Sequence, residues 1–263
     1  MSAPELLLYE HPLSSYAQKV KIALREKDLV FARLLPEDFG TGRRDTPFAA
    51  ASPLGEVPAL CVDGEAVFDS TIILAYLEDR WPDPPLLPQA PMDRARARTI
   101  EEICDSQYEA VNWGWGELLW FGRASGSLRE QLEAAARRET ARLQGWLETA
   151  LGEADWFGGT QFGLADLAAA PMVNRSVHYG LGPAAGSPLA RWHARLSRRP
   201  AVAQTFAEFD AAAAGMVRAA DSYRSGGRRR QYRDHRLEWM IRAGGLAVVE
   251  AGLRDDTIRF SSL

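Results

Sequence analysis

Two serines stand where the first apolar run of the chain gives way to an amphipathic helix. Ser14 and Ser15 follow Glu5–Tyr9, which is typical of a strand, and they open a helix predicted over 15–27. A hydroxyl at a helix N-terminus lies beside backbone amides that carry partial positive charge. A free thiol has a pKa near about 8.5, so this environment would stabilise a bound thiolate. The simpler interpretation is that one of the serines only caps the helix.

Two residue pairs further along the chain could bind the ends of a peptide. A cis Val57–Pro58 bond at the entry to a hairpin would turn the Val57 N–H and C=O outward, where an extended ligand can pair as an added strand. At the next strand-to-helix junction, the Ser70 hydroxyl and the first-turn amides suit a carboxylate, and Asp69 suits an ammonium. A carboxylate and an ammonium on one carbon describe a γ-glutamyl group. Ordinary helix capping also explains this second pair.

The elements that position these residues alternate between short β runs and amphipathic helices. A hairpin is strongly indicated because Asp63-Gly64 joins two β runs. The basic segment 40–46 is predicted to be a loop. The order is βαβ, a loop, then ββα, with strands over 5–9, 29–35, 57–62 and 65–68 and helices over 15–27 and 70–80.

The proline-rich segment 82–91 ends this pattern, and the residues beyond it are predicted to be helical. We therefore predict a first domain over 1–82, a linker over 83–92, an all-helical domain over 93–220 and a C-terminal extension over 221–263. The predicted helices cover 93–124, 128–151, 164–179, 189–196 and 200–214.

The C-terminal extension begins after Ala220, is interrupted at Ser225-Gly226-Gly227 and continues as RRRQYRDHR followed by an apolar stretch. The arginine run could form a phosphate-binding patch. Because Asp234 interrupts it, we favour a solvated helix face. Trp239, Met240 and Ile241 predict that the extension packs on the helical bundle.

Composition excludes several classes of function. The 263 residues are 46% apolar and 25% charged with a formal charge of −4, which is typical of a globular protein and gives no case for nucleic-acid binding. We expect no membrane span, no signal peptide and a cytoplasmic location. Cys61 and Cys104 are single and the four histidines are scattered, so no metal site is expected.

Taken in order, these motifs resemble the N-terminal domain of cytosolic glutathione transferases. The stretch HPLSSYAQKVKIALREKDLVF, the G-x-V-P hairpin and DSTIILAYL carry the resemblance, closely over residues 5–80 and less specifically to about residue 215. The first stretch is most similar to serine-type classes such as phi, tau and zeta. The resemblance implies an α/β domain of thioredoxin-like fold followed by an all-α domain. It also implies that Ser14 activates the thiol of glutathione, with Ser15 as the alternative.

The same resemblance assigns the remaining contacts to glutathione, which is the only cofactor implied. Val57, beside Pro58, would pair with the cysteinyl part, and Asp69 and Ser70 would hold the γ-glutamyl end. Arg44, or its neighbour Arg43, would face the glycine carboxylate.

Three positions depart from the family pattern. Asp69 stands where Glu is usual, which shortens its reach. Glu56 stands where Gln or Lys is commoner, so its carboxylate is expected to repel the glycine end of the tripeptide. Gly163 replaces the usual Ser or Thr before a buried helix, so Asp166 at the third helical position is expected to bond back to the cap as a structural residue.

The first long helix of the second domain is expected to supply an aromatic wall for the co-substrate. Its candidate residues are Tyr108, Asn112, Trp113, Trp115 and Trp120. Such a wall suits flat apolar ligands, although core packing would explain part of the set. The glycines between the tryptophans indicate close packing or space for a ligand.

We therefore expect conjugation of the glutathione thiolate to an apolar electrophile by a homodimer. The same thiolate could instead serve dehalogenation, ether cleavage or isomerisation, because a fold does not determine a reaction. A non-catalytic ligand-binding relative is the contrasting hypothesis.

Overall fold

A four-stranded mixed sheet forms the core of the N-terminal region. The structure is a computed structural model that describes residues 4–218 and 229–260. The strand order is β2-β1-β3-β4, with β1 parallel to β2 and the other neighbours antiparallel. The elements are β1 (Leu6–Tyr9), α1 (Ser15–Glu26), β2 (Ala32–Leu34), α2 (Pro47–Ala51), β3 (Ala59–Val62), β4 (Glu65–Phe68) and α3 (Ser70–Arg80).

The second strand is shorter than predicted. The expected strand covers 29–35, whereas β2 begins at Ala32. The Leu29 amide still donates to the Leu24 carbonyl at 3.0 Å, so it closes the end of α1, and Val30 is 90% exposed. The loop prediction over 40–46 omitted the short α2 that follows, which Thr46 caps through the Ala49 amide.

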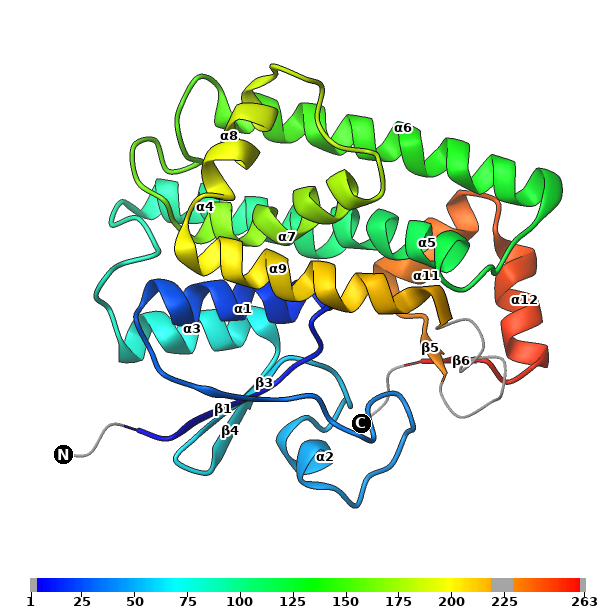
Figure 1. The fold of residues 1–263 in the computed structure, drawn as a ribbon, viewed down its shortest axis with the longest axis horizontal. Coiled ribbons are helices and arrows are strands. Elements are labelled where there is room, and N and C mark those ends of the chain that lie inside the picture. The colour runs from blue at the N-terminus through cyan, green and yellow to red at the C-terminus, as the bar shows by residue number, and fades with distance from the viewer. Residues whose placement is uncertain (1–3, 219–228, 261–263) are drawn as a thin grey trace.

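A helical region follows the sheet. It comprises α4 (Pro91–Ile103), a π-helical segment (Cys104–Tyr108), α5 (Glu109–Leu119), α6 (Gly126–Leu151), α7 (Leu164–His178), α8 (Pro188–Leu196), α9 (Pro200–Ala214) and a 3-10 turn (Gly215–Arg218). Figure 1 shows α1 and α3 lying between the sheet and these helices, while α2 lies beside the hairpin.

The single helix predicted over 93–124 is wrong in three respects. It begins at Pro91, where the missing N–H of proline costs nothing in the first turn. The segment Cys104–Tyr108 widens it into a π-helix. It ends at Leu119, shortly before Gly122 turns the backbone to a φ of +56°.

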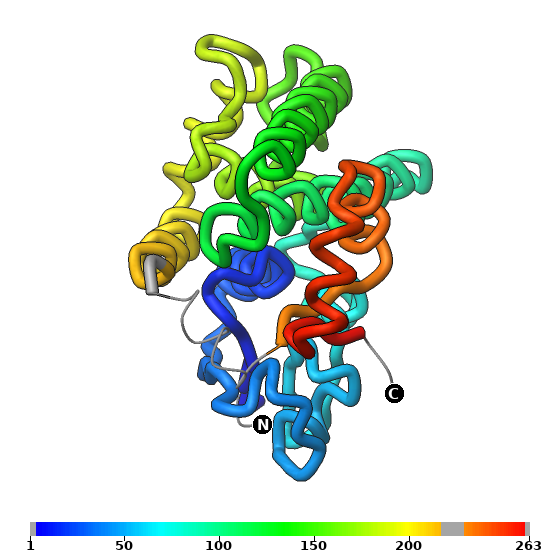
Figure 2. Tube along the Cα trace, turned by 90° about the vertical axis from the view of Figure 1, so that its right-hand side faces the viewer, coloured from blue at the N-terminus to red at the C-terminus, as the bar shows by residue number. Residues whose placement is uncertain are grey.

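The C-terminal extension forms two further helices and a small parallel ribbon. The ribbon pairs β5 (Arg230–Gln231) with β6 (Ile258–Arg259), and the helices are α11 (Asp234–Arg242) and α12 (Leu246–Arg254). Trp239 and Met240 are buried where α11 packs on α5, whereas Ile241 is exposed. Figure 2 shows this segment descending from the bundle toward the N-terminal domain. The predicted start after Ala220 and the break at 225–227 lie outside the described residues.

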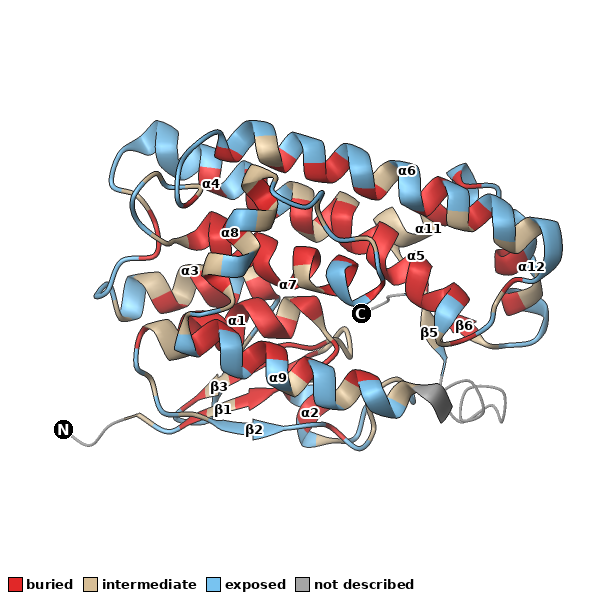
Figure 3. Ribbon diagram, turned by 45° about the horizontal axis from the view of Figure 1, so that its top comes forward, coloured by how far each residue is buried: buried red, intermediate tan, exposed pale blue. Residues whose placement is uncertain are grey.

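Buried apolar side chains form one continuous cluster through both regions. Leu8 and Leu60 of the sheet, Leu24 of α1 and Leu167 of α7 all belong to it and are fully buried. Burying one leucine side chain contributes about 1.5–3 kcal/mol to the free energy of folding. Because residues of both regions belong to this cluster, the contact between the regions is part of the core. Figure 3 shows buried residues along α1 and α7, where they face each other. Among the described helices, none has the length and apolar character to cross a membrane.

Candidate active site

Ser14 lies at the N-terminus of α1, directly after β1. Its Oγ accepts a hydrogen bond from the Ala17 amide at 3.2 Å and donates to the Val57 carbonyl at 3.4 Å. Ser14 is therefore the helix cap, and the capping interpretation is confirmed. The bond to Val57 is longer than an ordinary hydroxyl bond, so the hydroxyl hydrogen can turn to a better acceptor. Ser15 lies next to it with its side chain buried.

Two cavities meet beside this serine. The first, of about 210 Å³, is lined by Val57, Pro58, Asp69 and Ser70. The second, of about 220 Å³, is lined by Ser14, Ser15 and again Val57, together with side chains of α5 and the C-terminal extension. The predicted peptide-binding pairs and the predicted serine therefore lie along one groove.

The Val57–Pro58 bond is cis in the structure. The Ser52 hydroxyl fixes the backbone of Glu56, the residue that precedes this bond. Its Oγ donates to the Glu56 carbonyl at 2.8 Å and accepts from the Glu56 amide at 3.1 Å. At the other end of the groove, Asp69 caps α3 from a backbone φ of +70°. Both of its capping bonds, from the amides of Thr71 and Ile72, use Oδ1.

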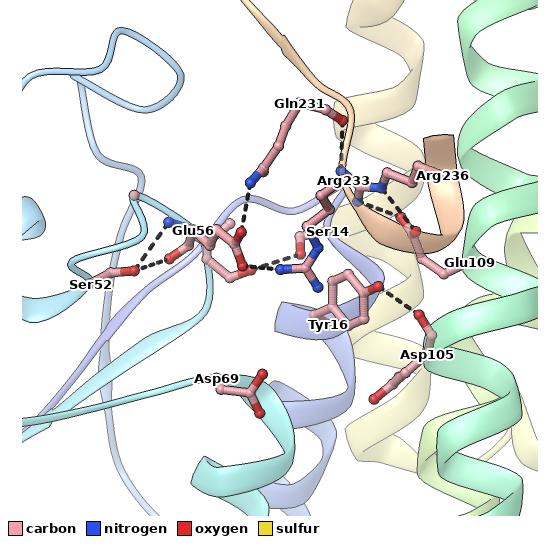
Figure 4. A network of polar contacts seen from close by, with 12 residues as sticks. Ser14, Tyr16, Ser52, Glu56, Asp69, Asp105, Glu109, Gln231, Arg233 and Arg236 are labelled. Atoms are coloured by element: carbon pink, nitrogen blue, oxygen red, sulfur yellow. Dashed lines mark hydrogen bonds and ion pairs between the residues drawn. The ribbon is translucent and has the colours of Figure 1, made fainter. Parts of the chain in front are cut away.

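The Glu56 carboxylate does not stand as the isolated charge that the sequence suggested. Arg233 pairs with one of its oxygens, and the Gln231 amide donates to the other at 2.6 Å. Figure 4 shows both side chains reaching Glu56 from the C-terminal extension. The expected repulsion of the tripeptide is therefore offset within the chain, because the formal charge of Glu56 is neutralised.

Arg233 lies across the groove. The two cavities share four lining residues, namely Tyr16, Glu56, Val57 and Arg233. The Arg233 guanidinium lies 5.8 Å from the centre of the Tyr16 ring. Burial by itself lowers the pKa of Arg233, but the negative charge of Glu56 and the nearby Tyr16 raise it by a larger amount. The net pKa is above its ordinary value, so the guanidinium stays charged. Sequence analysis did not single out this residue.

The arginine run is not a solvated helix face, contrary to the prediction. Arg230 and Arg236 form part-buried ion pairs with glutamates of α5: Arg230 Nε lies 2.6 Å from Glu117, and Arg236 Nη2 lies 2.7 Å from Glu109. Tyr232 between them is fully buried. A signal was present in the sequence, since two glutamates in a largely apolar helix must find cationic partners when they are buried.

Tyr16 connects the groove to the helical domain. Its hydroxyl donates to the Asp105 carbonyl at 2.7 Å, within the π-helical segment. Burial, reinforced by the nearby Glu109, raises the pKa of Tyr16 well above its ordinary value. The phenol is therefore a neutral donor that is already engaged, which leaves the serines as the hydroxyls that can serve a ligand.

The predicted aromatic wall divides between two faces of the π-helical segment and α5. Trp113 and Trp120 are seven residues apart and line the second cavity. Tyr108, Asn112 and Trp115 occupy the opposite face, are buried and line neither cavity, so the structure gives no support to their prediction as co-substrate residues. The physical reason is the helical period, which brings residues seven apart to one side.

Hydrogen bonds fix the core positions of Asn112 and Tyr108. Asn112 Nδ2 donates to the Met172 carbonyl at 2.9 Å, and its Oδ1 accepts from the Ser176 hydroxyl at 3.0 Å. The Tyr108 hydroxyl accepts from Gln144 at 3.0 Å. These polar groups are therefore satisfied inside the bundle.

Arg44 does not reach the two cavities beside Ser14. It is exposed, it donates to the Pro53 carbonyl, and it lines a neighbouring cavity with Arg229 and Arg259. These two arginines of the C-terminal extension also line the second cavity. Arg229 and Arg259 thus share a cavity with Ser14, whereas the arginine that the sequence suggested does not.

Asp166 has the structural role expected of it. Fully buried, it accepts from the amides of Phe157 and Gly163 at 3.1 and 3.0 Å and from the Trp192 indole at 2.8 Å. Burial raises its pKa to about 6, against the opposing effect of the hydrogen bonds. Within the described residues, no group of three or more His, Cys, Asp or Glu is arranged to hold a metal ion.

Comparison with known proteins finds two domain models in the chain. Residues 8–85 match "Glutathione S-transferase, N-terminal domain", and residues 118–200 match "Glutathione S-transferase, C-terminal domain". The described part of the C-terminal extension that follows residue 228 lies beyond both ranges.

Individual relatives agree with these models. Glutathione S-transferase GstB of Escherichia coli K12 is 30% identical over 193 residues, which cover 72% of this chain and 91% of the relative. Maleylacetoacetate isomerase of Pseudomonas aeruginosa is 31% identical and covers 66% and 82%. A glutathione S-transferase of Methylobacterium radiotolerans, solved in complex with glutathione sulfonate, superposes with a TM-score of 0.65 at 32% identity, covering 77% and 94%.

Proposed function

This chain belongs to the glutathione S-transferase family, and we propose that it activates glutathione at Ser14 for attack on an electrophile in the second cavity. The observation that carries the proposal is the convergence of Ser14, Val57 and the Asp69–Ser70 cap on one groove. Ser14 and the Asp69–Ser70 cap come from two strand-to-helix junctions, and Val57 comes from the connection between α2 and β3.

The groove suits an extended γ-glutamyl tripeptide. The Asp69 carboxylate and the Ser70 hydroxyl at the start of α3 would hold the ammonium and carboxylate of the γ-glutamyl end. The Val57 backbone would pair with the cysteinyl part. Its sulfur would then lie toward Ser14, whose hydroxyl already points at the Val57 carbonyl.

At this position the thiol loses its proton more readily. The Ser14 hydroxyl would donate to the sulfur, the N-terminus of α1 adds partial positive charge, and Arg233 lies beside the groove. The thiolate then attacks an electrophilic carbon held against Trp113 and Trp120. A carbon–sulfur bond forms while the leaving group, chloride in the case of a chlorinated arene, departs with its bonding electrons. The protein contributes activation and proximity.

Replacement of Ser14 tests the proposal. In Ser14→Ala we expect kcat/KM to fall about a hundredfold, as for loss of one donor to a developing anion. The pKa of the bound thiol should rise while glutathione affinity changes little. Thiolate absorbance titration, calorimetry and steady-state rates with a chlorinated nitroarene measure these three quantities.

Ser15→Ala is the matched control, because it removes a hydroxyl of the same kind one residue away. Full activity of Ser14→Ala together with an inactive Ser15→Ala would transfer the role to Ser15. Failure of the native protein to bind glutathione would overturn the proposal and leave a non-catalytic relative of the fold.

Isomerisation is a second candidate, favoured by the similarity to maleylacetoacetate isomerase. In that reaction the thiolate adds to an unsaturated carbon and leaves again, so glutathione is regenerated. Measuring whether glutathione is consumed with each turnover separates the two reactions.

We also propose a cytoplasmic homodimer, as the family resemblance implies. The interface would involve β4, α3 and α4. Each carries a large apolar side chain exposed to solvent: Phe68 is 37% exposed, Ile72 56% and Met92 64%. Light scattering in solution measures the assembly, and a monomer at high concentration would contradict it.

A further inference from the structure

The second cavity carries an excess of positive charge. Six arginines and two glutamates are among its lining residues. The arginines are Arg175 of α7 and five residues of the C-terminal extension, namely Arg229, Arg230, Arg233, Arg236 and Arg259. A wall built for a neutral apolar electrophile has no need of this charge.

Ion pairs within the chain account for several of these arginines. Arg236 binds both oxygens of Glu109, at 2.7 and 3.0 Å, and Arg233 pairs with Glu56. Arg230 pairs with Glu117, which is fully buried and is not among the lining residues. Both glutamates that line the cavity are thereby engaged with the extension.

Arg175 differs from these arginines. Its residue surface is only 6% exposed, yet within the described part of the chain its Nε and Nη2 have no hydrogen-bond partner. The guanidinium instead lies between two aromatic rings, 5.6 Å from Phe209 and 6.0 Å from Trp120. The positive charge of Arg175 helps to lower the pKa of Glu109, but both carboxylate oxygens of Glu109 accept hydrogen bonds from Arg236.

A buried guanidinium without an acceptor is costly, because desolvation of the charge is not repaid by hydrogen bonds. A second buried donor lines the same cavity: within the described residues, the Trp113 indole Nε1 also has no partner. Guanidinium and indole groups can only donate. An acceptor brought by a ligand in this cavity would satisfy both groups.

The remaining lining indicates the rest of that ligand. Trp113, Trp120 and Phe121 provide flat aromatic surfaces, and Leu13 and Met216 are apolar. An anionic group near Arg175 and a flat apolar body against these rings would use both kinds of wall.

We propose that the co-substrate is an aromatic or conjugated carboxylic acid, and that Arg175 binds its carboxylate. The inference rests on the proposed function only in calling this ligand the co-substrate. The anion site itself is a property of the cavity.

Calorimetry tests the site with two probes that share one aromatic ring and differ only in whether the carboxyl group is charged. We would titrate para-nitrobenzoate and its methyl ester into the native protein, Arg175→Gln and Arg175→Lys. The native protein should bind the carboxylate roughly tenfold to a hundredfold more tightly than the ester, as expected for a charge-assisted hydrogen bond. Arg175→Gln should lose this preference, and Arg175→Lys should keep part of it, with ester binding unchanged.

Arg137→Gln is the control for net charge. The Arg137 guanidinium lies 5.0 Å from the centre of the Trp115 ring, and Arg137 is not among the residues that line the cavity. This variant should retain the full preference for the carboxylate. Equal affinity of the native protein for the two probes would overturn the proposal, whether or not the variants fold. A preference that survives in folded Arg175→Gln would also overturn it.

Glutathione affinity is measured in the same variants. If Arg175→Gln lowers it as strongly as it lowers carboxylate binding, Arg175 serves the tripeptide and the proposal is wrong. If instead the native protein prefers the carboxylate but ignores glutathione, the anion site stands and the proposed transferase function fails.

Discussion

At the scale of single residues, one carboxylate holds the start of α7 in place. Asp166 accepts bonds from two loop amides and one indole, so it holds this helix start although the N-cap residue Gly163 has no side chain. Gly163 has an extended backbone, with φ at −159°, and therefore needs no glycine for conformational reasons. It needs one for space, because a Cβ there would lie 2.7 Å from the Leu86 carbonyl oxygen.

We expect Gly163→Ala to destabilise the protein by about 1–3 kcal/mol, the cost of overpacking a tight contact. Leu86 cannot withdraw easily, since its carbonyl accepts from the Leu164 amide at 2.7 Å. Urea unfolding measures the change. Gly145→Ala, at an exposed helical position with open space around the new methyl group, should instead raise stability by up to about 1 kcal/mol. Equal effects of the two substitutions would refute the steric argument.

At the scale of elements, α5 and the C-terminal extension form one unit. The glycines between the tryptophans of α5 indicated either close packing or ligand space, and at Gly114 the structure shows packing. A Cβ at this position would lie 2.1 Å from the Trp239 ring of α11. Since Arg230, Arg233 and Arg236 of the extension line the second cavity, the seating of α11 also sets the geometry of that cavity.

Gly114→Ala should therefore unseat α11. We expect a loss of about 1–3 kcal/mol in unfolding free energy, despite the better helix propensity of alanine. Faster tryptic cleavage within α11 would report the local release. Gly116→Ala is the matched variant in the same helix, because its Cβ meets only the Tyr179 hydroxyl at 3.2 Å and the Trp120 ring at 3.4 Å. A protein in which the first substitution is as mild as the second would contradict this role of Trp239.

At the scale of the whole molecule, a buried polar network joins the sheet domain to the helical domain. Lys19 of α1 lies 2.8 Å from Glu101 of α4 and pairs with Asp105 of the π-helical segment. Thr71 of α3 donates to Glu101 at 3.1 Å. The Lys19 side chain is fully buried, so both carboxylates depend on it for compensation of their charge.

Lys19→Met should cost about 3–5 kcal/mol of stability near neutral pH, because it leaves two buried carboxylates without a cation. The cost should shrink on acidification. Burial raises the pKa of Asp105 to about 6 although Lys19 lowers it, so removing Lys19 raises this pKa further. A carboxyl whose folded pKa exceeds its unfolded value favours folding at low pH, and that contribution disappears as pH rises through the folded pKa.

Unfolding free energies of the native protein and Lys19→Met at about pH 5 and about pH 8 check this prediction, with the larger deficit expected at the higher pH. Arg96→Met removes a cation from the exposed pair with Asp93 and should change stability by less than about 1 kcal/mol at either pH. A deficit for Lys19→Met that does not vary with pH would show that the carboxylates are not the cause.

The sequence by itself determined what depends on near neighbours. The βαβ and ββα order of the first region, the hairpin at Asp63-Gly64, the cap at Ser14 and the bond from Asp166 to Gly163 all depend on residues that are close along the chain. Local hydrogen bonding and hydrophobic periodicity suffice to predict such features, and the family motifs are built from them.

Only the tertiary structure decided which side of each element is covered and which charges meet. Arg233 neutralises Glu56 across 177 residues of chain, and the bundle buries Tyr108, Asn112 and Trp115 while leaving Trp113 on the cavity. No local pattern contains this information, because it arises when distant segments return to one place. A buried charge accepts whichever partner the completed fold brings to it.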